Sequence, residues 1–404
     1  MSLNSEPSGP LLISNVRPVG FGAGVDGSLT NILIGEDGCV LALGSHMQAP
    51  ETARVVDGQG SWISPGWTDL HAHVWRGGTD ISIDPSVCGI ERGVTTIVDA
   101  GSAGEANFAG FREFIIEPAR ERIKAFLNLG SIGLTASRQV SELTDMRSVN
   151  IDRIMACVEA NRDVIVGIKI RASGMITGGW GITPVKLAKR IAKILKLPVM
   201  AHVGEPPPLI DEVLAELGPG DVVTHCFNGK YAGSIIEDDD LFAMAERCAA
   251  EGIRLDVGHG GASFSFRTAK VAIERGLLPF TISTDAHARS VDGKVWDLGT
   301  TMSKLIALGM PFDKVIEAVT IAPASIIGLP VSGHLDIGRR AEFTVFDLAD
   351  SDLAVIDSSG QPARLKQLIE PRWTVLGNSA TRASRYQPLV KGSACPHCGG
   401  ALLR

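Results

Sequence analysis

The sequence predicts an α/β fold whose central unit is a (β/α)8 TIM barrel, and three observations support this prediction. The middle of the chain alternates short β-branched apolar runs with helical stretches, the pattern of repeated βα units on a parallel sheet. About eight such runs fall within residues 63–330, a length typical of this barrel. The two flanks, residues 11–62 and 333–386, contain short strands separated by Gly/Asp turns, and are therefore β-rich.

Eight segments of the middle region are expected to be strands. They are Ile63–His73, Thr96–Ala100, Ala125–Leu129, Val164–Arg171, Val199–Val203, Val222–Cys226, Ile253–Val257 and Phe280–Thr284. Helices are expected between them, for example at Val185–Leu195 and Leu241–Glu251. Because the repeat alone does not distinguish a closed barrel from an open sheet, a doubly wound open sheet is the competing fold.

The flanks and the end of the chain are expected to lie outside the barrel. The flanking strands are predicted at Leu11–Val16, Leu29–Ile34, Cys39–Leu43, Glu342–Leu348 and Trp373–Leu376. Residues 387–404 form a tail in which Cys395 and Cys398 have the Cys-x-x-Cys spacing of half a zinc ribbon. The chain has no second Cys-x-x-Cys, so a structural zinc there would need another subunit, or His397 and an outside ligand. A tail that binds no zinc is the favoured alternative.

The composition is that of a globular protein, with 45% hydrophobic and 21% charged residues. The balance of 38 Lys and Arg against 45 Asp and Glu gives a formal charge of −7, which argues against nucleic acid or a membrane surface as a partner. The 7 cysteines are scattered, as in a protein with reduced thiols, and no secretion signal is recognisable. We therefore expect a cytoplasmic protein that acts on a small molecule. A homo-oligomer is compatible with the sequence.

Polar side chains at the carboxyl ends of the predicted strands are the candidate site. His71 and His73 end the first strand, and because residues two apart in a strand point the same way, both can reach one metal ion. Asp69 has the same parity one step deeper, where it could orient an imidazole or lie beneath the metal. Active sites of (β/α)8 barrels lie at this face of the sheet.

Four further strand ends complete the set. Lys169 lies among apolar neighbours on the fourth strand, where a buried amine tends to be neutral and reactive. His202, His225 and Asp285 end the fifth, sixth and eighth strands, and imidazoles with a carboxylate suit Zn²⁺ or a similar ion. Taken singly, Lys169 could be a Schiff-base nucleophile or an ion-pair partner. Taken together, the set predicts a metal site.

With these residues the sequence resembles the amidohydrolase superfamily, specifically its members with two metals bridged by a carboxylated lysine. The stretches ISTDAH (282–287), VWDLGTTMSK (295–304) and GHGGASF (258–264) resemble the deacetylase-type branch often labelled dihydroorotase. The resemblance covers nearly the whole chain and implies a composite β-sandwich formed by both termini beside the barrel. It also implies the ligand assignment, with His71, His73 and Asp285 on one metal, His202 and His225 on the other, and Lys169 as the carbamate bridge.

The activity expected from this resemblance is hydrolysis of an acyl amide or ester by a metal-bridged hydroxide. Two divalent ions, expected to be zinc, lower the pKa of a shared water. Asp285 is the expected catalytic residue, taking the proton of this water and passing it to the leaving atom. Lys169 can serve as a bridge only after its neutral amine has captured carbon dioxide.

Three residues are candidates for substrate binding. Arg171 has the parity of Lys169 and could pair with a substrate carboxylate, although a structural ion pair at the rim is an equal alternative. Asn228 and His259 follow the sixth and seventh strands, and hydrogen bonding within their loops is the alternative for both. An amide or ester of a small carboxylate fits Arg171 best, and within this branch the resemblance implies an acetylated 2-hydroxy or amino acid.

Three rival functions remain. Dihydroorotase or another cyclic-amide hydrolase would use the same chemistry. A single-metal purine or pyrimidine deaminase is suggested by His202-Val203-Gly204-Glu205, in which the Glu would shuttle protons, but such enzymes have no use for Lys169. A non-catalytic scaffold is disfavoured because all six metal-ligand candidates are present.

Overall fold

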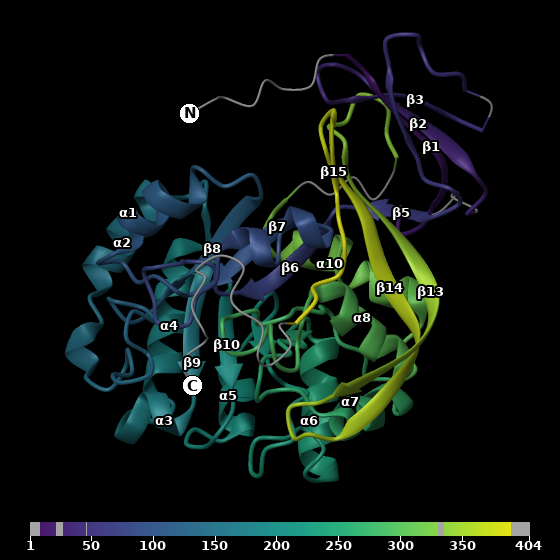
Figure 1. Ribbon diagram of the computed structural model, residues 1–404. Coiled ribbons are helices and arrows are strands. Elements are labelled where there is room, and N and C mark those ends of the chain that lie inside the picture. The colour runs from purple at the N-terminus through teal and green to yellow at the C-terminus, as the bar shows by residue number, and fades with distance from the viewer. Residues whose placement is uncertain (1–8, 22–26, 46, 330–334, 389–404) are drawn as a thin grey trace, which may run out of the picture.

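The computed structural model describes residues 9–21, 27–45, 47–329 and 335–388. These residues form a mixed α/β fold with a parallel sheet surrounded by helices and a second, mainly antiparallel sheet (Figure 1). Cys395 and Cys398, with the predicted zinc motif of the tail, lie outside the described residues. Within the described part of the chain, no helix is both long enough and apolar enough to cross a membrane.

The parallel sheet has seven strands that follow one another in chain order. They are β6 (Trp67–Ala72), β7 (Val94–Ala100), β8 (Arg122–Asn128), β9 (Ile165–Ala172), β10 (Val199–Val203), β11 (Val222–Thr224) and β12 (Arg254–Asp256). Every residue of β6 and β7 is buried. Burial on both faces is typical of a parallel sheet that is covered by helices.

The eighth predicted strand, Phe280–Thr284, is not a regular strand, but it lies between the two edges of this sheet. Isolated parallel bridges join Thr281 to Asp256 beside β12, and Ala286 to Ala72 at the end of β6. The sheet therefore curls, because its first and last strands are both paired with the same segment. The break in regularity falls next to Asp285, whose backbone has a φ of 48° that a regular strand does not allow.

Helices follow most of the parallel strands and cover their outer side. The longer ones are α2 (Ile151–Ala160), α4 (Thr183–Leu195), α5 (Ile210–Glu216), α6 (Asp239–Ala250), α7 (Phe266–Glu274), α8 (Leu298–Ala307), α9 (Phe312–Glu317) and α10 (Ile321–Ile326), with short turns at α1 (Phe108–Phe111), α3 (Gly174–Thr177), η1 (Pro85–Val87), η2 (Ile90–Arg92), η3 (Arg112–Ile116), η4 (Met146–Ser148) and η5 (Gly178–Trp180). Apolar side chains of α4 at helical spacing, such as Val185, Ala188 and Ile191, are buried in the largest hydrophobic cluster.

The second sheet is built from both ends of the chain. Its strands are β1 (Leu11–Pro18), β2 (Thr30–Ile34), β3 (Val40–Gly44), β4 (Arg54–Asp57), β5 (Trp62–Pro65), β13 (Glu342–Ile356), β14 (Pro362–Leu376) and β15 (Ser379–Arg382). They lie in the order β15-β14-β13-β5-β1-β2-β3, with β4 beside β1. The two β-rich flanks thus form one sheet with its own apolar cluster.

The first predicted strand, Ile63–His73, contributes one strand to each sheet. It divides at Gly66 into β5, which pairs with β1 and β13, and β6, which pairs with β7. A Cβ atom on Gly66 would lie 2.3 Å from the Thr95 Oγ1 atom, so only glycine allows the chain to pass this point.

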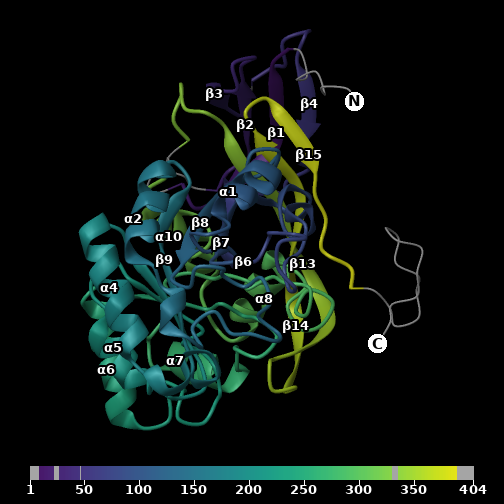
Figure 2. The same ribbon diagram turned by 90° about the vertical axis from the view of Figure 1, so that its left-hand side faces the viewer.

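Strands β13 and β14 form a hairpin that is longer than predicted and reaches along the helices that surround the parallel sheet (Figures 1 and 2). Its turn meets the chain that follows β12. The amide of Ser358 donates to the Phe264 carbonyl at 2.9 Å, and the amide of Phe266 donates to the Asp357 carboxylate at 3.0 Å. The second sheet therefore contacts a loop at the carboxyl end of the parallel strands.

Candidate metal centre

The predicted metal-ligand residues meet in one cavity at the carboxyl ends of the parallel strands. This cavity has a volume of about 420 Å³, and among the residues that line it are His71, His73, Lys169, His202, His225 and Asp285. They come from β6 and the residue that follows it, from β9 and β10, from the turn after β11, and from residues 281–286, the bridging segment that joins β12 to β6. Strand order across the sheet brings together side chains that are up to 214 positions apart, counted from His71 to Asp285.

Asp285 lies between His71 of β6 and His73, which directly follows this strand. Its Oδ1 atom is 3.4 Å from the Nε2 atom of His71 and 3.2 Å from that of His73. Its Oδ2 atom is 4.0 Å from the Nε2 atom of His225. One ligand atom each from His71, His225 and Asp285 lies within 4.8 Å of the others, so these groups could hold a metal ion.

Lys169 lies at the bottom of the same cluster. Its side chain is fully buried, and its Nζ atom is 3.4 Å from the Nε2 atom of His71 and 3.3 Å from the Sδ atom of Met200. Burial lowers the pKa of this amine to about 7, against the opposing attraction of Asp285. A substantial neutral fraction is therefore available near neutral pH, as the sequence predicted for a reactive lysine.

His202 and His225 lie side by side, with ring centroids 4.5 Å apart. Burial lowers the pKa of His225 to about 3 and holds that of His202 well below its usual range. Both rings are neutral at physiological pH, and a neutral imidazole is the form that binds a metal ion. The donor set of the cluster therefore fits divalent metal chemistry.

Hydrogen bonds behind the cluster orient the ring of His71. Its Nδ1 atom is 2.9 Å from the Oγ1 atom of Thr224, which in turn donates to the Asp256 carboxylate at 2.7 Å. Asp256 is fully buried and also accepts hydrogen bonds from Thr281 and Ser283. Because the hydroxyl of Thr224 donates its hydrogen bond to Asp256, its oxygen accepts a hydrogen bond from the Nδ1–H group of His71. The Nε2 atom of His71 then carries no hydrogen and is available as a ligand atom.

The rings of His73 and His225 are oriented in the same way. The Nδ1 atom of His73 is 3.0 Å from the Oγ atom of Ser102, and the Nδ1 atom of His225 is 2.5 Å from the Gly258 carbonyl oxygen. The carbonyl can only accept, so Nδ1 of His225 carries the proton. In both rings it is again Nε2 that is directed toward Asp285.

Asp69 lies one layer below these ligands, as its parity predicted. It accepts hydrogen bonds from the Thr284 amide at 3.0 Å and from the Thr284 hydroxyl at 2.5 Å. Burial raises the pKa of this carboxyl group to about 7. Asp69 therefore ties the segment that carries Asp285 to β6, and holds no metal-facing imidazole directly.

Arg171 lines the cavity and is also held in an ion pair. Its guanidinium donates two hydrogen bonds to Glu142, of 2.7 Å and 2.6 Å, and the Glu142 side chain is fully buried. The ion pair that was the alternative for Arg171 is therefore present. A substrate contact through the rest of the guanidinium is a prediction that this geometry leaves open.

Asn228 and His259 are both fully buried. The amide nitrogen of Asn228 donates to the carbonyl oxygens of His225 and Gly233, at 2.9 Å and 2.8 Å. The two ring nitrogens of His259 lie 2.8 Å from the Gly260 carbonyl oxygen and 2.9 Å from the Lys304 amine. These are bonds within and behind the loops, so a substrate contact of either residue stays a prediction.

Three residues of the site, Arg138, Arg289 and Glu142, were not predicted from the sequence. Arg138 and Arg289 line the cavity from loops after β8 and after the bridging segment, and Glu142 orients Arg171. His287 also lines it, with Nε2 3.9 Å from the Oδ2 atom of Asp285. Loops after strand ends were the available signal, but loop residues lack the alternation that assigned inward positions within the strands.

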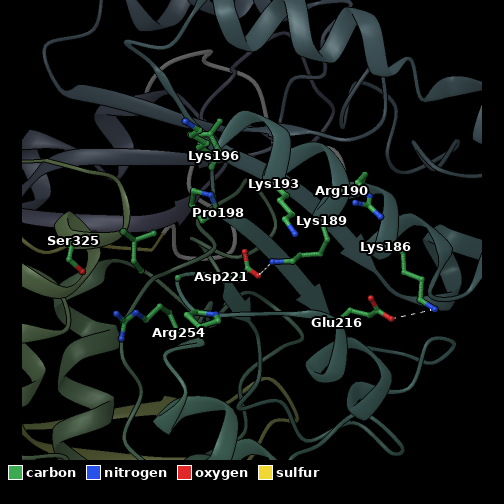
Figure 3. Close-up of a pocket in the computed structure, with 14 residues that line it drawn as sticks. Lys186, Lys189, Arg190, Lys193, Lys196, Pro198, Glu216, Asp221, Arg254 and Ser325 are labelled. Atoms are coloured by element: carbon green, nitrogen blue, oxygen red, sulfur yellow. Dashed lines mark hydrogen bonds and ion pairs between the residues drawn. The ribbon is translucent and has the colours of Figure 1, made fainter.

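A larger cavity, of about 810 Å³, lies at the opposite end of the sheet (Figure 3). Asp221 and Arg254, which line it, stand at the amino ends of β11 and β12. Asp221 is paired with Lys189, and Glu216 with Lys186 at 3.3 Å. Figure 3 shows the other labelled basic side chains pointing in different directions. The cavity therefore has no convergent set of groups comparable to that around Asp285.

Comparisons with known proteins agree with this geometry. A model of the amidohydrolase family matches residues 262–381. The chain is 63% identical over 389 residues to a deacetylase of Brucella anthropi, covering 96% of this chain and 97% of that protein. A crystal structure of a dihydroorotase is also 63% identical, with a TM-score of 0.91 over 95% of this chain and 100% of that one. A crystal structure of an adenine deaminase is 32% identical, with a TM-score of 0.83 over 92% and 99% of the two chains.

Relatives that are this similar over nearly the full length share the family of the chain they match. The resemblance first indicated by the histidines, the lysine and the aspartate at the strand ends is thereby confirmed. The chain belongs to the amidohydrolase family.

Proposed function

We propose that the protein is a metal-dependent deacetylase that hydrolyses the acyl amide or ester bond of a small acylated 2-hydroxy or amino acid. The convergence of neutral imidazoles, Lys169 and Asp285 in one cavity carries this proposal. The relative from Brucella anthropi, 63% identical, is named a deacetylase, which supports the same activity. The substrate is a small molecule, because the cavity has a volume of about 420 Å³.

We further propose that the parallel sheet and the bridging segment form a closed (β/α)8 barrel, and that residues 11–62 and 333–386 form the composite β-sandwich. Leu70, Val98, Phe126, Met200 and Val222, from five different strands, pack in one cluster. Side chains of so many strands meet when a sheet closes on itself. The bridges from residues 281 and 286 to β12 and β6 support the closure.

The proposed cofactors are two divalent metal ions, with zinc the metal that suits these donors. His71, His73 and Asp285 would hold one ion, His202 and His225 the other, and Lys169 would bridge them. Bound ions would supply Lewis acidity to a water molecule and to the acyl carbonyl. Lys169 would act as a bridge once its neutral amine had added carbon dioxide and released a proton to solvent, a step favoured by its burial and lowered pKa.

Asp285 is the proposed proton carrier. Its carboxylate lies within 4.0 Å of four histidine Nε2 atoms, those of His71, His73, His225 and His287, and can accept the proton of an attacking water there. It can then give this proton to the nitrogen or oxygen of the leaving group. The hydrogen bonds from Thr284 to Asp69 hold the segment that carries Asp285 in place.

Three guanidinium groups favour an anionic substrate. Arg138, Arg171 and Arg289 all line the cavity, and of the three only the guanidinium of Arg171 is paired with a carboxylate, that of Glu142, in the described part of the chain. Guanidinium groups bind carboxylates through two parallel hydrogen bonds. A substrate whose carboxylate lay among these groups would have its acyl group directed toward the metal ligands. This orientation agrees with an acylated 2-hydroxy or amino acid.

The rival activities share this fold. A solved relative at 63% identity is described as a dihydroorotase, so cyclic-amide hydrolysis is the second candidate. Deamination is less well supported, because Glu205 is half exposed and pairs with Lys230 at 2.8 Å and with Ser173 at 3.0 Å. That geometry directs the carboxylate to Lys230 and not to Asp285.

A substrate panel tests the proposal. The zinc-loaded protein, expressed with bicarbonate, would be assayed on N-acetyl amino acids, O-acetyl 2-hydroxy acids, their neutral methyl esters, cyclic imides and purines. We expect release of acetate from the acetylated acids and little from their methyl esters. Turnover restricted to cyclic imides would replace the deacetylase by the cyclic-amide hydrolase, and turnover restricted to purines would overturn hydrolysis of acyl bonds.

A further inference from the structure

Lys304 is a buried lysine outside the metal cluster. It lies on α8 with 1% of its surface exposed, and its Nζ atom contacts the Nε2 atom of His259 at 2.9 Å and the carbonyl oxygen of Lys294. Burying an amine costs free energy, and both of these partners are uncharged acceptors. The proposed chemistry does not use this lysine, so its position requires another explanation.

The contact with Lys304 determines the tautomer of His259. Because the amine donates a hydrogen bond to Nε2, Nε2 carries no hydrogen of its own, and the ring N–H is the one at Nδ1. Nδ1 then donates to the Gly260 carbonyl oxygen at 2.8 Å. The ring also packs against Phe264, with ring centroids 4.8 Å apart. His259 thus connects Lys304 to the backbone of the loop that follows β12.

This loop touches the proposed proton carrier. Gly260 has a φ of 52°, and a Cβ atom at this position would lie 2.4 Å from the Oδ2 atom of Asp285. The amide of Gly260 donates to the Thr284 carbonyl oxygen at 2.9 Å, next to Asp285 in the chain. The following residues, Gly261, Ala262 and Ser263, line the cavity. A displacement of the loop would therefore move one wall of the site.

We propose that Lys304 is a positioning residue for the active site, which acts through His259 to hold the loop of residues 258–264 against Asp285. This role assigns His259 to the support of the loop instead of to the substrate. An amine with two N–H groups satisfies both acceptors, so the contact is available to the ammonium and to the neutral amine alike.

A double-mutant cycle tests whether Lys304 acts through His259. Lys304→Met and His259→Leu should each lower kcat on the order of 10-fold to 100-fold, because small displacements at a reacting centre have effects of this size. If the two residues act as one unit, the double variant loses no more than either single variant. Losses that multiply would overturn the proposal. Lys304→Gln keeps one N–H donor for His259 and should recover part of the rate.

Two controls separate positioning from general destabilisation. Ser303→Ala, next to Lys304 on α8, removes the bond from the Ile369 amide, 2.8 Å long, and should lower the melting temperature without lowering kcat. Metal content should stay unchanged in all variants. If Lys304→Met lowers the melting temperature as Ser303→Ala does but keeps the wild-type kcat, Lys304 is a structural residue only.

Hydrogen exchange tests the positioning without any assay of activity. In Lys304→Met, amide exchange should become faster in the peptide covering residues 258–264 and stay unchanged in Ser303→Ala. Unchanged exchange in that peptide would overturn the proposal. The inference rests on the proposed function for its kinetic arm only. A wild-type protein that hydrolyses none of the panel would refute the function, and the exchange arm would still decide the role of Lys304.

Discussion

The guanidinium of Arg171 and the carboxylate of Glu142 form two parallel hydrogen bonds, 2.7 Å and 2.6 Å long, at the wall of the cavity that holds the candidate metal ligands. Burial alone would raise the pKa of Glu142, but the charge of Arg171 and the hydrogen bonds to the carboxylate together outweigh it and hold the pKa below its usual value of 4.5. Glu142 therefore stays ionised, and Arg171 is held rigidly with one edge of its guanidinium already occupied.

Replacing Glu142 by Gln should destabilise the fold and weaken substrate binding. Losing one partner of a buried ion pair costs roughly 3 to 5 kcal/mol of unfolding free energy. We also expect KM for acetylated acids to rise about 10-fold, because Arg171 would no longer be held in position to bind the substrate carboxylate, and the loss of one hydrogen-bonded contact has an effect of this order. Urea unfolding and steady-state kinetics measure both effects. Asp163→Asn, which breaks the exposed pair with Arg112, is the control and should change stability by less than about 1 kcal/mol.

The direction of the pKa shift of Glu142 determines how the stability contributed by this ion pair depends on pH. A carboxyl group whose folded pKa is lowered stabilises the fold above its unfolded pKa of 4.5, and this contribution is lost as the pH falls through the folded value. The stability difference between wild type and Glu142→Gln should therefore shrink below pH 4.5. A difference that stays constant down to the acid transition would contradict the ion-pair account.

Thr224→Val should weaken metal binding without touching any ligand. The valine cannot accept the proton of His71 Nδ1, so the ring loses the partner that orients it. Partners of this kind contribute about 10-fold to 100-fold in metal affinity, which competition with a chelator measures. Thr281→Val is a matched control, because Thr281 donates to the same carboxylate of Asp256 but contacts no metal-ligand imidazole. Equal losses in both variants would assign the effect to Asp256.

Lys169→Met should reduce the number of metal ions bound per chain. The methionine fills a similar volume but cannot add carbon dioxide, so the proposed bridge is lost. Elemental analysis of the purified protein should show about one ion fewer per chain, in line with two sites sharing one bridging ligand. Lys193→Met, an exposed residue of α4, serves as the control. An unchanged metal content in Lys169→Met would remove Lys169 from the site.

Arg289→Met should discriminate against charged substrates only. If Arg289 attracts the substrate carboxylate, kcat/KM for acetylated acids should fall about 10-fold to 100-fold, in line with the loss of one charge-assisted bond. Activity on the neutral methyl esters should not change. The ratio of kcat/KM for the acids to kcat/KM for the esters therefore measures the effect. Arg190→Met, on the outside of α4, should leave both activities unchanged. A parallel loss on acids and esters would assign Arg289 to the structure of the loop.

Lys304 should make the stability of the fold depend on pH above neutrality. Burial lowers its pKa from 10.5 to about 7, against the attraction of Asp297 and Asp357. Between these values the unfolded chain binds more protons than the folded chain, so the unfolding free energy rises with pH, by at most about 1.4 kcal/mol per pH unit. Unfolding in urea at pH 7 and pH 9 should show a smaller increase for Lys304→Met than for wild type. Equal increases would contradict the buried position of Lys304.

Much of the candidate metal centre could be predicted from the sequence because strands impose a local rule. Side-chain alternation placed His71 and His73 on one side of β6, and the strand ends placed Lys169, His202, His225 and Asp285 at one face. Burial of parallel strands on both faces produced the apolar runs that located seven strands of the sheet. The family could be recognised from the sequence for the same reason, because these strand-end residues are the ones on which the resemblance rests.

Only the tertiary structure decided which groups support the site. Glu142 pairs with Arg171 across 29 positions, and Lys304 contacts His259 across 45 positions. Neither contact follows a helical or strand period, because loops without regular geometry bring the partners together. The division of the first strand at Gly66 has the same origin, since it depends on the approach of Thr95 from the next strand. Local periodicity determined the strands and their inward-facing ligands, whereas the partners of buried polar groups depend on non-local packing, which the order of residues along the chain does not display.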